Sequence, residues 1–148
     1  MNSTVSLAAN LFEELGDREK SALQILRRAY DVVPDVGGSY ARSEAARHLG
    51  QIQQERGDPK GALKFLEESL QLLAEARLTR HLAFGLHAIG FARLEAGDLG
   101  GAEDYLRRAR EMAERYGSRF ILGLIGRTEA DLTFRHLTSY KVHGRTHP

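Results

Sequence analysis

Two stretches of the chain, ERGDPKGALKFLEESLQLL at residues 55–73 and EAGDLGGAEDYLRRAREMA at residues 95–113, follow the same pattern forty residues apart. Each contains a Gly-Asp pair that is followed by small residues and then by large apolar ones. The following positions coincide after a shift of forty residues: Gly50 with Gly90, Gly57 with Gly97, Asp58 with Asp98, Ala62 with Ala102, and Leu66 with Leu106. Self-similarity at such a period indicates stacked copies of one supersecondary unit.

The repeated unit is predicted to be helical throughout. Leu, Ala, Glu and Arg are frequent and the chain has only three prolines, which favours helix. Apolar residues recur with a period near 3.6, and Ala62, Leu66, Leu70 and Leu73 fall on one stripe. The sequence predicts seven helices, at about residues 4–15, 18–32, 40–56, 59–77, 80–96, 99–116 and 119–137, followed by an irregular tail at 138–148.

Gly-Asp pairs mark the elbows between paired helices, at residues 16–17, 57–58 and 97–98. Glycine ends a helix readily because it adopts positive φ without steric cost. The aspartate beside it can accept a hydrogen bond from the free N–H groups of the next helix. Pro59 then stands at a first helical position, where its missing N–H is not needed.

Composition limits the classes of function. The chain has 148 residues, of which 42% are hydrophobic and 28% charged, and a net charge of +1, which predicts one globular domain over residues 1–137. This balance gives no reason to expect binding to nucleic acid or to a membrane. The absence of cysteine excludes disulfides and thiolate metal sites. Because the N-terminus lacks the pattern of a signal peptide, we expect a cytoplasmic protein.

The repeat resembles the tetratricopeptide repeat family, in its longer variety of about forty residues known from bacterial regulators and kinesin light chains. The matching positions are the small residues Gly50, Gly90, Ala62 and Ala102, the apolar anchors Leu66 and Leu106, and the terminal proline Pro34. Small residues let the two helices of a hairpin approach closely. The sequence departs from the family where Ala46 or Leu86 replaces an aromatic residue and where Gln53 or Arg93 replaces an apolar anchor.

The resemblance implies an all-α, right-handed α-solenoid of antiparallel helical hairpins. The expected hairpins span about residues 2–34, 42–77 and 82–117, and a capping helix follows at 119–137. On this cap, Ile125 and Leu132 are expected to face the preceding hairpin. Gly126, Glu129 and Thr133 are expected to lie where a further second helix would pack.

The resemblance also implies that the first helices of the hairpins line a concave groove that binds a protein or peptide. The predicted partner-binding residues are Arg47, Gln51, Gln54, Phe84, His87, Phe91, Leu94, Leu124, Arg127, Asp131 and Phe134. The first hairpin would add Ser6, Asn10, Glu13 and Glu14, and the flanking positions Glu44, Glu55, Glu95 and Arg135 share this face. The apolar members are expected to form one patch. The alternative is that Phe84 and Phe91 pack between repeats, since a seven-residue spacing is also core spacing.

No motif predicts catalysis, a cofactor or a metal site. The basic run at residues 105–119 contains the i,i+4 ion pair Glu111–Arg115, and its first arginine pairs with Glu103, which favours a solvated helix face over a nucleic-acid site. His48 is expected to be a packed, hydrogen-bonded histidine. We therefore expect a non-enzymatic scaffold for an amphipathic helix or an extended apolar peptide. The alternatives are a homodimer formed through the groove or the capping helix, and the peptide-sensing fragment of a bacterial regulator.

Overall fold

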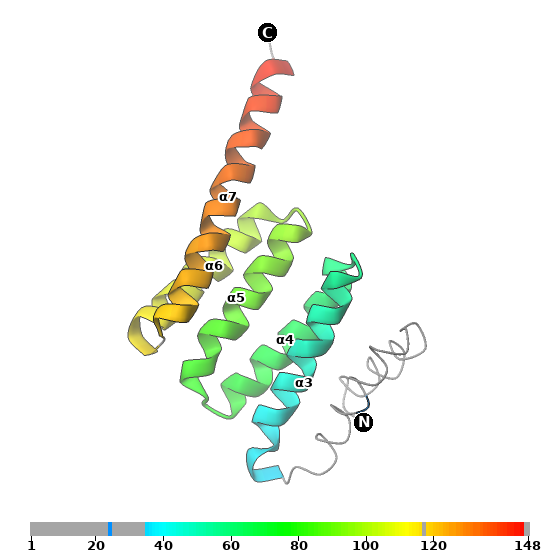
Figure 1. Cartoon of the computed structure of the whole chain (residues 1–148), viewed down its shortest axis with the longest axis vertical. Helices are drawn as coiled ribbons and strands as arrows, with labels where there is room; N and C mark the ends of the chain where they lie inside the picture. Colours follow the sequence, from blue (N-terminus) through cyan, green and yellow to red (C-terminus); the bar gives the residue numbers. More distant parts are fainter. Residues whose placement is uncertain (1–23, 25–34, 117, 147–148) are drawn as a thin grey trace.

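The computed structural model describes residue 24 and residues 35–116 and 118–146, and all the elements in this part of the chain are α-helices (Figure 1). Their bounds are Asp35–Glu55 for α3, Pro59–Glu75 for α4, Thr79–Glu95 for α5, Leu99–Tyr116 for α6 and Arg119–Thr146 for α7. The predicted all-α fold is confirmed. The helices expected at 4–15 and 18–32, and with them the first hairpin, lie outside the described residues.

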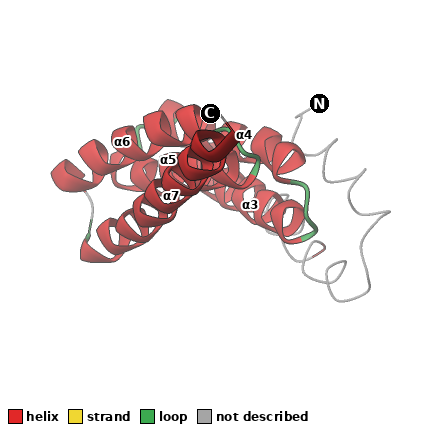
Figure 2. Ribbon diagram, turned by 90° about the horizontal axis from the view of Figure 1, so that it is seen from above, coloured by secondary structure: helices red, strands yellow, loops and turns green. Residues whose placement is uncertain are grey.

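The helices pair as antiparallel hairpins, α3 with α4 and α5 with α6, and α7 packs on the second hairpin. Seen from above, the described part is arched (Figure 2). The first helices α3, α5 and α7 form its inner side, and α4 and α6 form its outer side. This is the predicted solenoid of helical hairpins.

Close approach within each hairpin depends on the two glycines identified in the repeat. A Cβ atom added at Gly50 would lie 2.8 Å from Leu66 Cδ2, and one added at Gly90 would lie 3.0 Å from Leu106 Cγ. Because Leu66 and Leu106 are buried, neither can move aside easily. Ala62 and Ala102 are also completely buried. Small residues therefore set the helix spacing, as the sequence predicted.

The two elbows repeat the same hydrogen bonds. Gly57 and Gly97 both have φ of +86°, a left-handed conformation that favours glycine. At the first elbow, the Asp58 carboxylate accepts from Gly61 N at 2.8 Å and from Gln53 Nε2 at 2.8 Å.

At the second elbow, the Asp98 carboxylate accepts from Gly101 N at 3.0 Å and from Arg93 Nη1 at 2.9 Å. Arg93 also lies 3.5 Å from Glu67, and its guanidinium lies over the Tyr105 ring at 5.1 Å. Gln53 and Arg93, which replace the family's apolar anchor, therefore hold the capping aspartates. The departure from the family pattern has a structural role.

Successive hairpins stack through a continuous apolar core. Ala83 and Leu86 of α5 share one cluster with Ala109 of α6 and with Ile121 and Ile125 of α7. Within the first described hairpin, the buried Ser69 hydroxyl of α4 donates to the Ser43 carbonyl of α3 at 2.8 Å, whereas the apolar cluster joins α7 to α5 and α6. These contacts place α7 firmly against the second hairpin.

The capping helix packs as predicted but is longer than predicted. Ile125 and Leu132 are buried against the preceding hairpin, with Leu132 beside Leu94. The irregular tail expected at 138–148 is wrong, because α7 continues to Thr146. No glycine or proline interrupts residues 138–143, and Thr138 Oγ1 donates to the Phe134 carbonyl at 2.9 Å. Polarity suggested a tail, but polarity alone does not end a helix.

The start of α3 also differs from the prediction, which placed it near residue 40. The helix begins at Asp35 and includes Gly37 and Gly38. Glycine weakens a helix by about 1 kcal/mol relative to alanine, which the packed later turns can offset. Among the described residues, no helix combines the length and hydrophobicity that crossing a membrane requires.

We predict that Gly50→Ala lowers the free energy of unfolding by about 1–3 kcal/mol, since the added methyl group would collide with buried Leu66. Gly100→Ala is the matched control, because nothing lies within 4 Å of a Cβ at that helical position. This control should be neutral or stabilising by up to about 1 kcal/mol. Urea unfolding measures both, and equal effects of the two variants would contradict the close-approach explanation.

We predict that Asp98→Ala lowers stability by about 0.5–2 kcal/mol through loss of the helix cap. The hydrogen bond from Gly101 N, followed by that from Arg93, lowers the pKa of Asp98. The stability that this carboxylate contributes is therefore present above its unfolded pKa of about 3.9 and is lost as pH falls below it.

Unfolding curves at pH 7 and pH 3 should consequently differ less for Asp98→Ala than for the unaltered chain. Asp104→Ala is the control, because this exposed carboxylate pairs with Arg107 within α6 and caps no helix. If both variants lose equal stability, the cap is not the reason.

Candidate functional site

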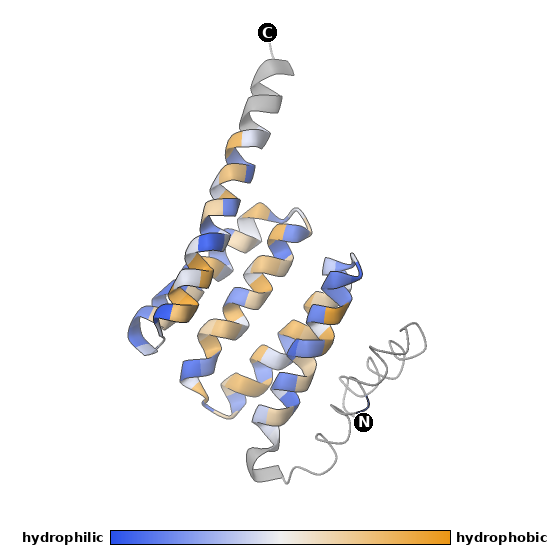
Figure 3. Cartoon of the chain, in the orientation of Figure 1, coloured by the Kyte–Doolittle hydropathy of each residue, from blue (hydrophilic) through white to orange (hydrophobic). Residues whose placement is uncertain are grey.

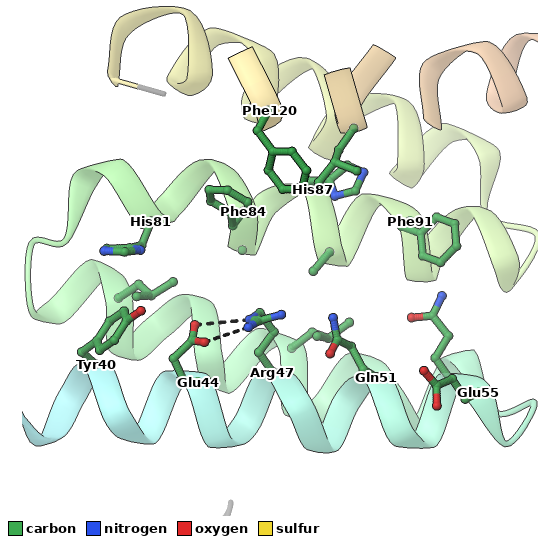
Figure 4. A pocket seen from close by; sticks show the side chains of 16 residues that line it. Tyr40, Glu44, Arg47, Gln51, Glu55, His81, Phe84, His87, Phe91 and Phe120 are labelled. Carbon is green, nitrogen blue, oxygen red and sulfur yellow. Dashed lines mark hydrogen bonds and ion pairs between the residues drawn. The ribbon is translucent and has the colours of Figure 1, made fainter. Parts of the chain in front are cut away.

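The inner side of the arch contains a cavity of about 710 Å³, which we call the inner groove (Figure 4). Helix α3 forms one wall and α5 the other, with α7 along the far edge of α5. The lining residues are Tyr40, Glu44, Arg47, Gln51, Gln54, Glu55, Leu66, Leu73, His81, Phe84, Gly85, His87, Ala88, Phe91, Phe120 and Leu124.

The α5 wall is largely aromatic. Phe84, His87 and Phe91 follow one another at spacings of three and four, which places them on one helix face. Phe84 packs beside Phe120 of α7, with ring centroids 6.4 Å apart, and is half-buried against the core. Phe91 is 38% exposed and stacks on His87 with centroids 6.4 Å apart. The two alternatives for these phenylalanines, packing between repeats and exposure in the groove, therefore each describe one residue. Phe84 helps to pack the repeats, whereas Phe91 is open to solvent.

The α3 wall is polar. Arg47 pairs with Glu44 at 2.7 Å across one helical turn. Burial acts to raise the pKa of Glu44, but the hydrogen bond and charge of Arg47 outweigh it, so the pKa is lowered. Tyr40 and His81 meet across the groove with ring centroids 4.8 Å apart. The side chains of Glu44, Arg47 and Gln51 rise toward the aromatic wall in Figure 4.

His87 is held by α7 in a neutral form. Its Nε2 lies 2.8 Å from Thr128 Oγ1, and Thr128 uses its only hydroxyl proton to donate to the Leu124 carbonyl at 3.1 Å. Thr128 Oγ1 must then accept, so Nε2 of His87 is the donor. Burial lowers the pKa of His87, and the Leu124 backbone carbonyl, which favours the protonated ring, only partly opposes this. At neutral pH the groove therefore presents an uncharged imidazole.

Seven predicted groove residues line the cavity together: Arg47, Gln51, Gln54, Phe84, His87, Phe91 and Leu124. The prediction for Leu94 is wrong, because its side chain is fully buried against Ala102, Leu106 and Leu132. Leu94 belongs to the core between α5, α6 and α7. The single patch expected to run through it is therefore interrupted.

Three predicted residues of α7 do not line the cavity. Arg127 and Phe134 are exposed, and Asp131 pairs with Arg135 at 3.3 Å. Arg135 in turn donates to the Leu94 carbonyl at 3.0 Å. The distal part of α7 extends past the end of α5 (Figure 1), so no opposite wall encloses it.

Some predicted residues lie elsewhere. The first-hairpin residues Ser6, Asn10, Glu13 and Glu14 lie outside the described residues. His48 is not packed as expected, because its side chain is 44% exposed beside Glu44. Its forty-residue equivalent, Ala88, lines the groove, so this position faces the inner side rather than the helix crossing.

Tyr40 and Phe120 are groove residues that the analysis of the sequence missed. They are eighty residues apart, so they occupy equivalent positions of the forty-residue repeat near the starts of α3 and α7. The signal that could have identified them is that both are aromatic at the same repeat position.

The sequence model described as tetratricopeptide repeat matches residues 41–115, half of the chain. This range covers α4 and α5, all of α6 but its last residue, most of α3, and both Gly-Asp elbows described above. No curated protein and no solved structure matches the chain.

We predict that the stability of the chain falls as pH is lowered from 7 to 5. Because burial lowers the pKa of His87, the unfolded chain binds a proton near pH 6.5 that the folded chain resists. This contribution is complete above the unfolded pKa and is lost below it. His87→Gln should flatten the pH dependence, measured by urea unfolding at several pH values. His48→Gln, an exposed control, should keep the original slope.

Proposed function

Because this chain belongs to the tetratricopeptide repeat family, whose members generally serve as scaffolds for protein–protein interaction, we propose that it is a non-enzymatic scaffold that binds a peptide segment of another protein in the inner groove.

The observation that carries the proposal is the contrast between the two walls of the groove. The α5 wall and the start of α7 offer Phe84, Phe91 and Phe120 together with a neutral His87. The α3 wall offers amides and charged groups, among them Gln51 and Glu55. A ligand that matches both walls is apolar on one side and polar on the other.

An amphipathic helix or an extended segment with alternating polarity has this property, and both are established modes of peptide recognition. Phe91 should contribute most to affinity. Phe91 is exposed and stacks on His87, so a ligand side chain can pack against both rings. Aromatic residues commonly act as anchors in this way. Phe84 is already half-buried and should act mainly as the floor of the site.

We predict that Phe91→Glu weakens peptide binding by at least about tenfold, because a carboxylate would have to be desolvated against the aromatic wall. Peptides for this measurement are selected from a displayed random library on the unaltered chain and are measured by calorimetry. The selected peptides should carry apolar residues on one face only.

Phe134→Glu is the matched control, since this phenylalanine is exposed on α7 and does not line the groove. It should leave the affinity unchanged. If selected peptides bind Phe91→Glu as tightly as the unaltered chain, the groove is not their site. If no peptide can be selected, the function as a peptide scaffold is contradicted.

A further inference from the structure

Helix α7 is a first helix without a second helix among the described residues. In the forty-residue register, Ala130 stands where Gly50 and Gly90 stand, and Phe134 stands where Leu94 stands. In α5, Gly90 and Leu94 are covered by α6. In α7, Phe134 is 67% exposed. The helix therefore presents a face that is built for contact with another helix but is open.

At Gly123, on this face, no described residue comes close to the helix. A Cβ atom added at Gly123 would meet nothing within 4 Å, whereas one added at Gly90 meets Leu106. The buried residues Ile121, Ile125 and Leu132 lie on the other side of α7, against α5 and α6. Hydrophobic and hydrophilic residues alternate along α7, including the part that extends beyond the hairpins (Figure 3).

The open face follows a heptad pattern. Its residues, which we call the α7 seam, are exposed and spaced alternately by three and four: Phe120, Gly123, Arg127, Ala130, Phe134 and Leu137. Such spacing is typical of helices that pair along a narrow seam. Three large apolar residues, 57–68% exposed, stand toward its two ends, and the small residues Gly123 and Ala130 flank Arg127 at its centre.

We propose that the α7 seam pairs with the α7 seam of a second copy of this chain, with the two helices antiparallel. The seam is self-complementary in this direction. Phe120 lies opposite Leu137 of the second copy, Gly123 opposite Phe134, and Arg127 opposite Ala130. Each pair then occurs twice about the two-fold axis, as an isologous interface requires. Large residues meet small ones at the centre, so the helices can approach closely.

Charge favours the same arrangement. Within the described part of the chain, Arg127 forms no ion pair that the structure records, and it lies exposed. Antiparallel pairing brings Arg127 within one residue of the level of Asp131 of the second copy, on both sides of the axis. Parallel pairing would place the two Arg127 side chains at the same level and leave Gly123 opposite Gly123, whereas antiparallel pairing offsets the two arginines by about 5 Å along the axis. Like charges at one level destabilise an interface, so the antiparallel direction is preferred.

The symmetry of the seam is the reason for choosing a second copy over an unrelated helix. A helix face that binds a different protein has no need to be complementary to an antiparallel copy of itself. One helix pair buries less surface than the about 1,200–2,000 Å² of stable interfaces, so we expect a dimer that dissociates on dilution. Such a dimer carries two inner grooves, which would bind a two-site partner by avidity.

Sedimentation equilibrium of the full chain, from about 1 μM to 1 mM, tests the pairing. We expect the mass to rise from that of one chain to that of two. Phe134→Glu should raise the dissociation constant at least about tenfold, while helicity by circular dichroism stays unchanged because the side chain is exposed. Phe91→Glu, which alters the inner groove, should dimerise like the unaltered chain. These two variants separate failure of the dimer from failure of peptide binding.

The direction of the helices is tested by single cysteines, since the chain has none of its own. In the antiparallel pair, two copies of residue 130 lie about 5 Å apart along the axis, and two copies of residue 123 about 16 Å apart. A short thiol cross-linker should therefore join Ala130→Cys efficiently and Gly123→Cys poorly. Three results would overturn the proposal: a chain that stays monomeric at 1 mM, which would leave the seam to a different partner; dimerisation that survives Phe134→Glu; or equal cross-linking at both positions.

Discussion

The architecture depends on the contact between a glycine in each first helix and a leucine in each second helix. A methyl group added at Gly50 would collide with Leu66, and one added at Gly90 would fit only if Leu106 shifted. This contact sets the distance between the helices of a hairpin. The same spacing, repeated after forty residues, sets how one hairpin stacks on the next, and stacking of equal units produces the arch (Figure 2). The inner groove is a consequence of this repetition.

The elbows show how a repeat can lose an apolar anchor and remain stable. Gln53 and Arg93 stand where the family usually has an apolar residue, and each donates a hydrogen bond to the aspartate that caps the following helix. The two donors differ in charge, but each donates to the Oδ2 oxygen of its own capping aspartate, Asp58 or Asp98. The hairpin buries less apolar surface at this position, but these hydrogen bonds hold the turn in place. The fold therefore tolerates polarity at its ends because its centre is closely packed.

The first helices α5 and α7 differ in which of their faces are open to a partner. On α5 the inner face is aromatic and its opposite face is buried by α6, so only the inner face can bind a partner. On α7 the start of the helix contributes Phe120 and Leu124 to the groove, and the rest carries an uncovered seam. The proposed peptide site and the proposed dimer interface are therefore separate surfaces that share one helix. Occupation of one does not by itself cover the other, apart from the common edge at Phe120.

The sequence by itself determined the helices, the elbows and the close contacts, because these arise between residues near one another in the chain. Helical spacing, the Gly-Asp pairs and the small residues at positions 50, 62, 90 and 102 were sufficient. Seven of the eleven predicted partner-binding residues line the inner groove, since the repeat carries the inner face from one hairpin to the next. Only the tertiary structure decided whether Leu94 and Phe134, which occupy equivalent positions of the forty-residue repeat, are buried or exposed. Leu94 is buried because α6 and α7 cover it, while Phe134 is exposed because no later helix does. The difference in burial depends on which helices pack against each residue, and the local sequence around the residue does not contain that information.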